Sequence, residues 1–160
     1  ALMLTLTTMP AAPKETRSPA QQIFELVNQI RSDHNLRPLK VSPELSKSAQ
    51  GYAAQMGKEN FFGHTSPNGS TCVSRDCAAG YTDWKALAEN LAAGYESPKE
   101  VVDAWMKSPG HRKNMLAPDV KETGIGYALV PGSHYETYWV QEFGTRKARV
   151  ARTGENEAAD

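Results

Sequence analysis

The stretch VVDAWMKSPGHRKNML, residues 101–116, constrains the fold most, because it predicts a helix, a break and a second helix. Ser108-Pro109 restarts the helix: a serine side chain accepts from free amides at an N-cap, and proline fits the first helical position. His111 then lies at about the third residue of the second helix. There the helix dipole disfavours an imidazolium, so we expect a neutral His111 that is able to act as a ligand.

Three more Ser-Pro dipeptides predict helix starts, at Ser18-Pro19, Ser42-Pro43 and Ser97-Pro98. Apolar residues follow each start at helical spacing. The first helix is expected to end at about Asn35, and the second at Gly57 or Asn60. A shorter helical turn is predicted from residue 74 to residue 79.

The last third of the chain is β-like. Residues 123–130 and 136–143 are rich in β-branched and aromatic side chains, and Pro131-Gly132-Ser133 between them predicts a hairpin. Gly124 and Gly126 leave room for another part of the chain, or a ligand, to approach the sheet closely.

Length and charge limit the classes of function. With 160 residues and 39% hydrophobic content, we expect one domain with a core, over residues 16–145. The 18 basic and 18 acidic side chains cancel, so no nucleic-acid partner is predicted. No run approaches the roughly 18–20 apolar residues of a transmembrane segment.

The two ends of the chain are expected to lie outside the domain. Residues 1–15 resemble the end of a signal peptide, which indicates export to the extracellular space or the periplasm. The alternative is a disordered arm. Residues 146–160 are predicted to be a flexible polar tail. Cys72 and Cys77 have four residues between them, which favours a local disulfide in an exported protein over a CxxC motif; in a cytosolic protein both would be reduced thiols.

Two further residues are candidates for a site. His64 lies on a rigid corner between two phenylalanines and the turn Ser66-Pro67-Asn68-Gly69, where it is either a structural group or a ligand. Glu89 is a carboxylate inside an apolar run, so it either points to solvent or faces a polar site.

Five segments together resemble the CAP superfamily of cysteine-rich secretory proteins, antigen 5 and pathogenesis-related 1, also called SCP-like extracellular proteins. They are FFGHTSPNG, AENLAAGY, VVDAWMKSPGHRKNML, TGIGYALV and YWVQEFG, in an order and at separations typical of compact bacterial members. The resemblance covers about residues 19–144. It implies an α+β fold, a three-layer α–β–α sandwich with a small antiparallel sheet between helices.

The resemblance also implies a cleft built around two histidines and two acidic residues. The matching positions are His64, Glu89 and His111, and Ser108 stands with Pro109 where relatives carry the second acid. His64, Glu89, Ser108 and His111 are therefore the predicted cleft residues, with His64 and His111 the candidate metal ligands. Zn²⁺ fits such a donor set, although no cofactor is expected to be required.

Three hypotheses for function follow. The first, which we favour because the second acid is absent, is an extracellular module that binds a lipid, a sterol, a protein or a glycan without catalysis. The second is a zinc-dependent hydrolase in which Glu89 is the general base; no other catalytic residue is predicted. The third is a structural role, in which the polar cluster attaches the helix break to the sheet.

Overall fold

A mixed four-stranded sheet in the order β1-β3-β4-β2 forms the centre of the protein, in a computed structural model that describes residues 16–148. Its strands are β1 (Lys40–Val41), β2 (Trp84–Ala93), β3 (Glu122–Leu129) and β4 (Thr137–Arg146). β2, β4 and β3 are antiparallel neighbours, as predicted, and β3 and β4 form the predicted hairpin. The prediction of an antiparallel sheet is wrong for β1, which runs parallel to β3. Helical crossovers separate these two strands in the chain, and such connections permit parallel pairing.

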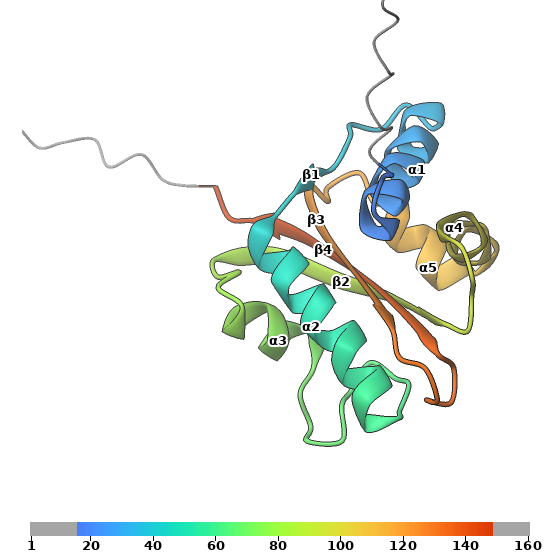
Figure 1. Cartoon of the computed structure of the whole chain (residues 1–160). Coiled ribbons are helices and arrows are strands. Elements are labelled where there is room, and N and C mark those ends of the chain that lie inside the picture. Colours follow the sequence, from blue (N-terminus) through green and yellow to red (C-terminus); the bar gives the residue numbers. More distant parts are fainter. Residues whose placement is uncertain (1–15, 149–160) are drawn as a thin grey trace, which may run out of the picture.

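Helices cover both faces of the sheet, so the predicted three-layer α–β–α arrangement is confirmed (Figure 1). One face carries α2 (Pro43–Glu59) and α3 (Cys72–Ala78). The other carries α1 (Pro19–Asp33), α4 (Pro98–Lys107) and α5 (Pro109–Met115). The apolar core is divided in the same way: Trp105 and Phe143 belong to one buried cluster, and Tyr52 and Val140 to the other.

The Ser-Pro helix starts are confirmed. The side chains of Ser18, Ser42 and Ser97 each accept from the backbone N–H three residues on. Ser108 also stands at an N-cap, but its hydroxyl makes no capping hydrogen bond. Pro109 at the first helical position therefore favours the start of α5 without a serine cap. The side chain of Ser108 lines a pocket beside His111.

Two glycines let α2 lie directly against β3. A Cβ atom on Gly124 would lie 2.1 Å from the carbonyl carbon of Leu45, and one on Gly126 would lie 2.2 Å from the carbonyl oxygen of Ala49. The close approach predicted from these glycines is therefore that of α2.

The predicted Cys72–Cys77 disulfide is wrong, because both cysteines are free thiols on α3. Residues five apart on an α-helix have Cα atoms roughly 8–9 Å apart, beyond the ~7 Å that a disulfide can bridge. Their side chains also leave the helix on different sides: Cys72 is half-buried and Cys77 is exposed. The sequence spacing favoured a local disulfide, but α3 separates the two sulfur atoms.

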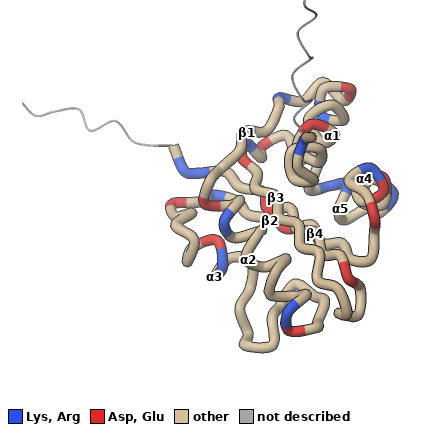
Figure 2. Tube along the Cα trace, in the orientation of Figure 1, with Lys and Arg blue, Asp and Glu red and all other residues tan. Residues whose placement is uncertain are grey.

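The predicted arm of residues 1–15 and most of the predicted tail of residues 146–160 lie outside the described residues. β4 ends at Arg146, the first residue of the predicted tail. Within residues 16–148, none of the helices is long and apolar enough to cross a membrane. Basic and acidic residues are interspersed over the helices and loops (Figure 2).

Candidate functional site

Three of the predicted site residues gather around one long edge of the sheet, formed by strand β2. Glu89 lies on β2, His64 in the loop between α2 and α3, and His111 on α5. Since β2 is paired only with β4, its other edge faces these segments. Residues far apart in the chain therefore meet where the sheet ends.

Glu89 is buried and is bonded to both His64 and Arg75, so it faces a polar site and not solvent. One carboxylate oxygen lies 2.7 Å from Nδ1 of His64, and the other lies 2.5 Å from a guanidinium nitrogen of Arg75. Arg75 is itself only 9% exposed, and its guanidinium stacks 3.3 Å from the ring centre of Tyr52. Burial opposes ionisation of Glu89, but the hydrogen bond from His64 and the charge of Arg75 outweigh it and lower its pKa.

Two more carboxyl groups lie beside this ion pair. Glu142 on β4 is the register partner of Glu89, and Asp76 follows Arg75 on α3. Both side chains are fully buried. Burial and the negative charges of Glu89 and Asp76 raise the pKa of Glu142 well above its usual range. Burial likewise raises the pKa of Asp76 to about 6. The region thus contains three carboxyl groups and one buried arginine.

His64 is oriented by its carboxylate partner. Because Nδ1 bonds Glu89, Nε2 is the ring nitrogen that remains for a ligand. The His64 side chain is 62% exposed, so that nitrogen is accessible. The hydrogen bond to Glu89 raises the pKa of His64 above its ordinary value despite partial burial.

His111 is positioned by two asparagines. The side chain of Asn90 donates to the His111 carbonyl at 3.1 Å, and the side chain of Asn114 donates to Oδ1 of Asn90 at 2.9 Å. Together these bonds attach α5 to β2. Burial, followed by the charge of nearby His64, lowers the pKa of His111. The predicted neutral form is therefore favoured, and the causes are burial and a neighbouring charge.

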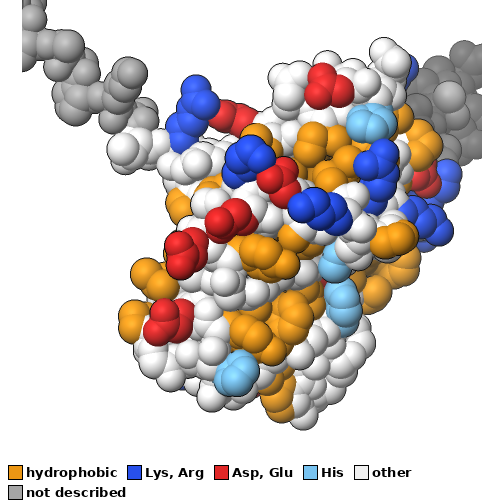
Figure 3. Space-filling model, turned by 90° about the vertical axis from the view of Figure 1, so that its right-hand side faces the viewer, with side chains coloured by type: hydrophobic (Ala, Val, Ile, Leu, Met, Phe, Trp, Pro, Cys, Tyr) orange, Lys and Arg blue, Asp and Glu red, His pale blue; other side chains and the backbone are white. Residues whose placement is uncertain are grey.

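A pocket of about 300 Å³ lies beside His111 and contains Ser108 as well. Its lining is mostly apolar and consists of Phe62, Leu91, Ala92, Ala93, Tyr95, Ala104, Trp105, Ser108 and His111. The indole N–H of Trp105 donates to the Leu91 carbonyl at 2.9 Å, so α4 covers part of the edge of β2. Figure 3 shows histidine side chains beside apolar surface on this side of the molecule. Larger hollows of about 900 and 650 Å³ lie elsewhere and include neither His64 nor His111 in their linings.

A sequence profile of the Cysteine-rich secretory protein family, CAP, matches residues 24–143. The chain belongs to this family. It is 37% identical over 136 residues to protein YkwD of Bacillus subtilis (strain 168), a match that covers 85% of the chain and 51% of YkwD. This CAP domain thus spans about half the length of that relative.

Solved structures agree with this assignment. An extracellular protein of Bacillus anthracis that contains an SCP domain has 30% sequence identity and a TM-score of 0.71, covering 88% of this chain and 45% of its own. An outer surface protein of Borrelia burgdorferi has 27% identity and a TM-score of 0.71, covering 78% of this chain and 90% of its own. The fold of this CAP domain therefore occurs in bacterial proteins described as extracellular or surface-located.

Sequence reasoning missed three residues of this CAP domain's buried polar cluster: Arg75, Asp76 and Glu142. Glu142 carried a usable signal, because it alternates with Tyr138 and Val140 on one face of an apolar strand. A carboxylate at such a position is as unusual as the one at Glu89, which was recognised. Arg75 and Asp76 lie in a polar segment and carried no comparable signal.

In metal-free protein, the pKa values of the two histidines of this CAP domain are expected to differ from 6.5 in opposite directions: His64 lies above it and His111 below it. A raised pKa means that His64 contributes stability below pH 6.5, and this contribution is lost as the pH rises through its folded pKa. His111, with a lowered pKa, contributes stability above pH 6.5 that is lost as the pH falls through its folded pKa. NMR titration of the imidazole Cε1–H signals measures both. In Glu89→Gln the pKa of His64 should fall; an unchanged His64 titration would contradict the assigned hydrogen bond.

Proposed function

We propose that this chain is an extracellular binding module that holds the apolar part of a small amphipathic ligand in the pocket beside β2. His64 and His111 would meet the polar end of that ligand. The proposal includes secretion, which is supported by the outer surface and extracellular relatives.

The observation that carries the proposal is the composition of the pocket, an apolar lining with His111 at its side. Phe62 and Tyr95 are 45% and 37% exposed, although large aromatic side chains are normally more deeply buried. Small-molecule sites combine such apolar walls with a few placed polar groups. The lining therefore favours a ligand with an apolar body and one polar end.

The size and charge of the pocket narrow the ligand class. A volume of about 300 Å³ stands at the lower limit of small-molecule pockets, which favours one acyl chain over a large ring system such as a sterol. The pKa of His64 is raised by its hydrogen bond to Glu89, which favours the protonated imidazole near His111 more than in an isolated histidine. An acyl chain that ends in a carboxylate satisfies both features.

The alternative, a zinc-dependent hydrolase, requires Glu89 to act as general base. Both Glu89 oxygens are already engaged, by His64 and Arg75, and its pKa is lowered, which makes it a weak base. His64 and His111 do fit zinc as nitrogen ligands, and Glu89 would then orient His64 for the ion. The geometry thus favours a binding role for His64 and His111 over a catalytic role for Glu89.

Titration with decanoate, followed by tryptophan fluorescence, tests the binding proposal. We expect saturable binding in the wild-type chain and at least roughly tenfold weaker binding in Ala104→Leu, because the added methyl groups occupy the pocket. Ala78→Leu is the matched control, since Ala78 is exposed on α3 and does not line the pocket. Absence of saturable binding, or equal affinity in Ala104→Leu, would overturn the proposal.

A further inference from the structure

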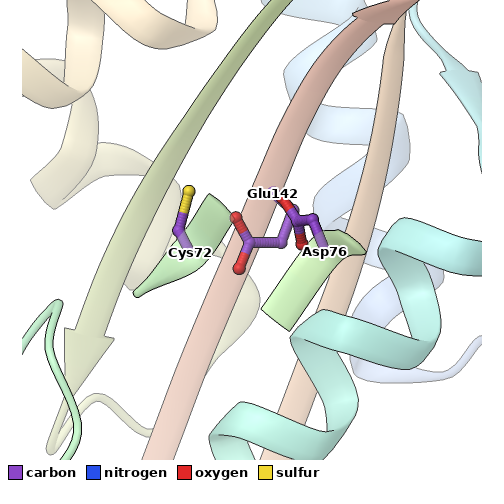
Figure 4. Close-up of side chains that lie close together, drawn as sticks. All are labelled: Cys72, Asp76 and Glu142. Carbon is purple, nitrogen blue, oxygen red and sulfur yellow. The ribbon is translucent and has the colours of Figure 1, made fainter. Parts of the chain in front are cut away.

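A second group of side chains lies under α3, away from the histidine pocket. Cys72, Asp76 and Glu142 each offer one ligand atom, and these three atoms lie within 4.8 Å of one another. Figure 4 shows the three side chains between α3 and β4. Cys72 and Asp76 are four residues apart on α3, so they share the helix face turned toward the sheet, and Glu142 meets them from β4.

The two carboxyl groups of this set lie close to Ser48 and Glu89 but make no hydrogen bond of good geometry within residues 16–148. Asp76 and Glu142 are both 0% exposed, and none of their four carboxyl oxygens has a hydrogen-bond partner within the described residues. A buried carboxyl group without a partner costs several kcal/mol if it is charged. Two such groups that point toward one thiol indicate that a positively charged partner belongs between them.

From this arrangement we infer a divalent metal site formed by Cys72 Sγ and one carboxylate oxygen each from Asp76 and Glu142. It does not depend on the proposed ligand pocket.

The donor set selects the metal. A thiolate combined with carboxylates suits Zn²⁺, whereas Ca²⁺ and Mg²⁺ prefer oxygen ligands alone. Zinc bonds of 2.0–2.3 Å in a tetrahedral site place ligand atoms about 3.5 Å apart. The three atoms lie within 4.8 Å of one another, so each pair needs to close by at most about 1.3 Å to reach that spacing. A water molecule would complete the four ligands.

Charge and access are also suitable. Arg75 is already paired with Glu89, so three anionic ligands and a divalent cation leave a net charge of about −1 in this buried region, against about −3 without the ion. Cys72 is half-buried, whereas Asp76 and Glu142 are fully buried, so Cys72 is the ligand nearest to solvent. Burial raises the pKa of the Cys72 thiol, so Zn²⁺ must displace that proton to form the metal–sulfur bond. Affinity is therefore expected to fall as the pH is lowered.

Titration of the reduced, metal-free full chain with Co²⁺ tests the inference, because a near-ultraviolet thiolate-to-Co²⁺ absorption band requires sulfur coordination. We expect the band to saturate at one Co²⁺ per chain and to disappear when Zn²⁺ is added. Cys72→Ser should abolish it, and Glu142→Gln should weaken binding roughly a hundredfold.

Two variants separate this site from other metal sites. Cys77→Ser, which alters the exposed cysteine of the same helix, should keep the band, and so should the double variant His64→Ala/His111→Ala. A missing band, a band that survives Cys72→Ser, or a band lost with the histidines would overturn the inference. Asp76→Asn replaces Glu142→Gln if the latter fails to fold. In the His64→Ala/His111→Ala background, Zn²⁺ should also raise the Tm, and adding Cys72→Ser should remove that increase.

Discussion

Replacing Arg75 with methionine should lower the free energy of unfolding at pH 7 by about 3–5 kcal/mol, the usual cost of removing one partner from a buried ion pair. Arg75 holds Glu89 at 2.5 Å and donates to the backbone carbonyls of Ser70 and His64. Without it, Glu89 would lose its arginine partner while Asp76 and Glu142 remain buried nearby. Urea unfolding in the presence of a chelator measures the loss.

The pH dependence of this loss provides a further check. Because the deficit comes from buried carboxylates, it should shrink as they become protonated at acid pH. Arg17→Ala is the matched control: Arg17 pairs with Glu25 on the surface, with side chains 68% and 49% exposed, and its loss should cost less than about 1 kcal/mol. Equal losses in the two variants would show that Arg75 does not stabilise a buried cluster.

Gly126→Ala should lower the free energy of unfolding by about 3 kcal/mol, the upper end of the cost of overpacking. The new Cβ would lie 2.2 Å from the carbonyl oxygen of Ala49 and 2.4 Å from the backbone nitrogen of Gln50. These atoms belong to the backbone of α2, so rotation of a side chain cannot relieve the contact. Urea or thermal unfolding of the purified variant measures the effect.

Gly51→Ala is the control for this change. Gly51 lies on α2 with no atom within 4 Å of an added Cβ, so alanine there should stabilise the chain by about 0.5–1 kcal/mol through its higher helix propensity. A Gly126→Ala variant as stable as the wild type would mean that α2 and β3 are separated further than the structure shows.

Much of the fold follows from local chemistry that is readable in the sequence. Ser-Pro at a helix start combines an N-cap acceptor with a residue that needs no N–H partner, and such signals depend on only a few adjacent residues. The helices that start at Pro19, Pro43 and Pro98 were located in this way. The hairpin after Leu129 was predicted in the same way, from turn residues between two β-rich segments.

The disulfide and the β1 pairing show the limit of such reasoning. Four residues between two cysteines in a polar segment favoured a local disulfide, but a capping box at Thr71 starts a helix there and separates the sulfur atoms. β1 has only two residues and no alternation to read, so its parallel pairing with β3 depends on where the helices carry the chain.

His64, Glu89 and His111 were selected from the sequence because each stands in an unusual local context, and the family resemblance placed them in one cleft. The tertiary structure decided what surrounds them. Arg75 reaches Glu89 from α3, and Glu142 is its neighbour across the sheet. Sequence by itself determined which segments are helices or strands, since propensity and capping act over a few residues. Only the tertiary structure decided which charges are buried together, because burial and pairing arise when distant segments pack.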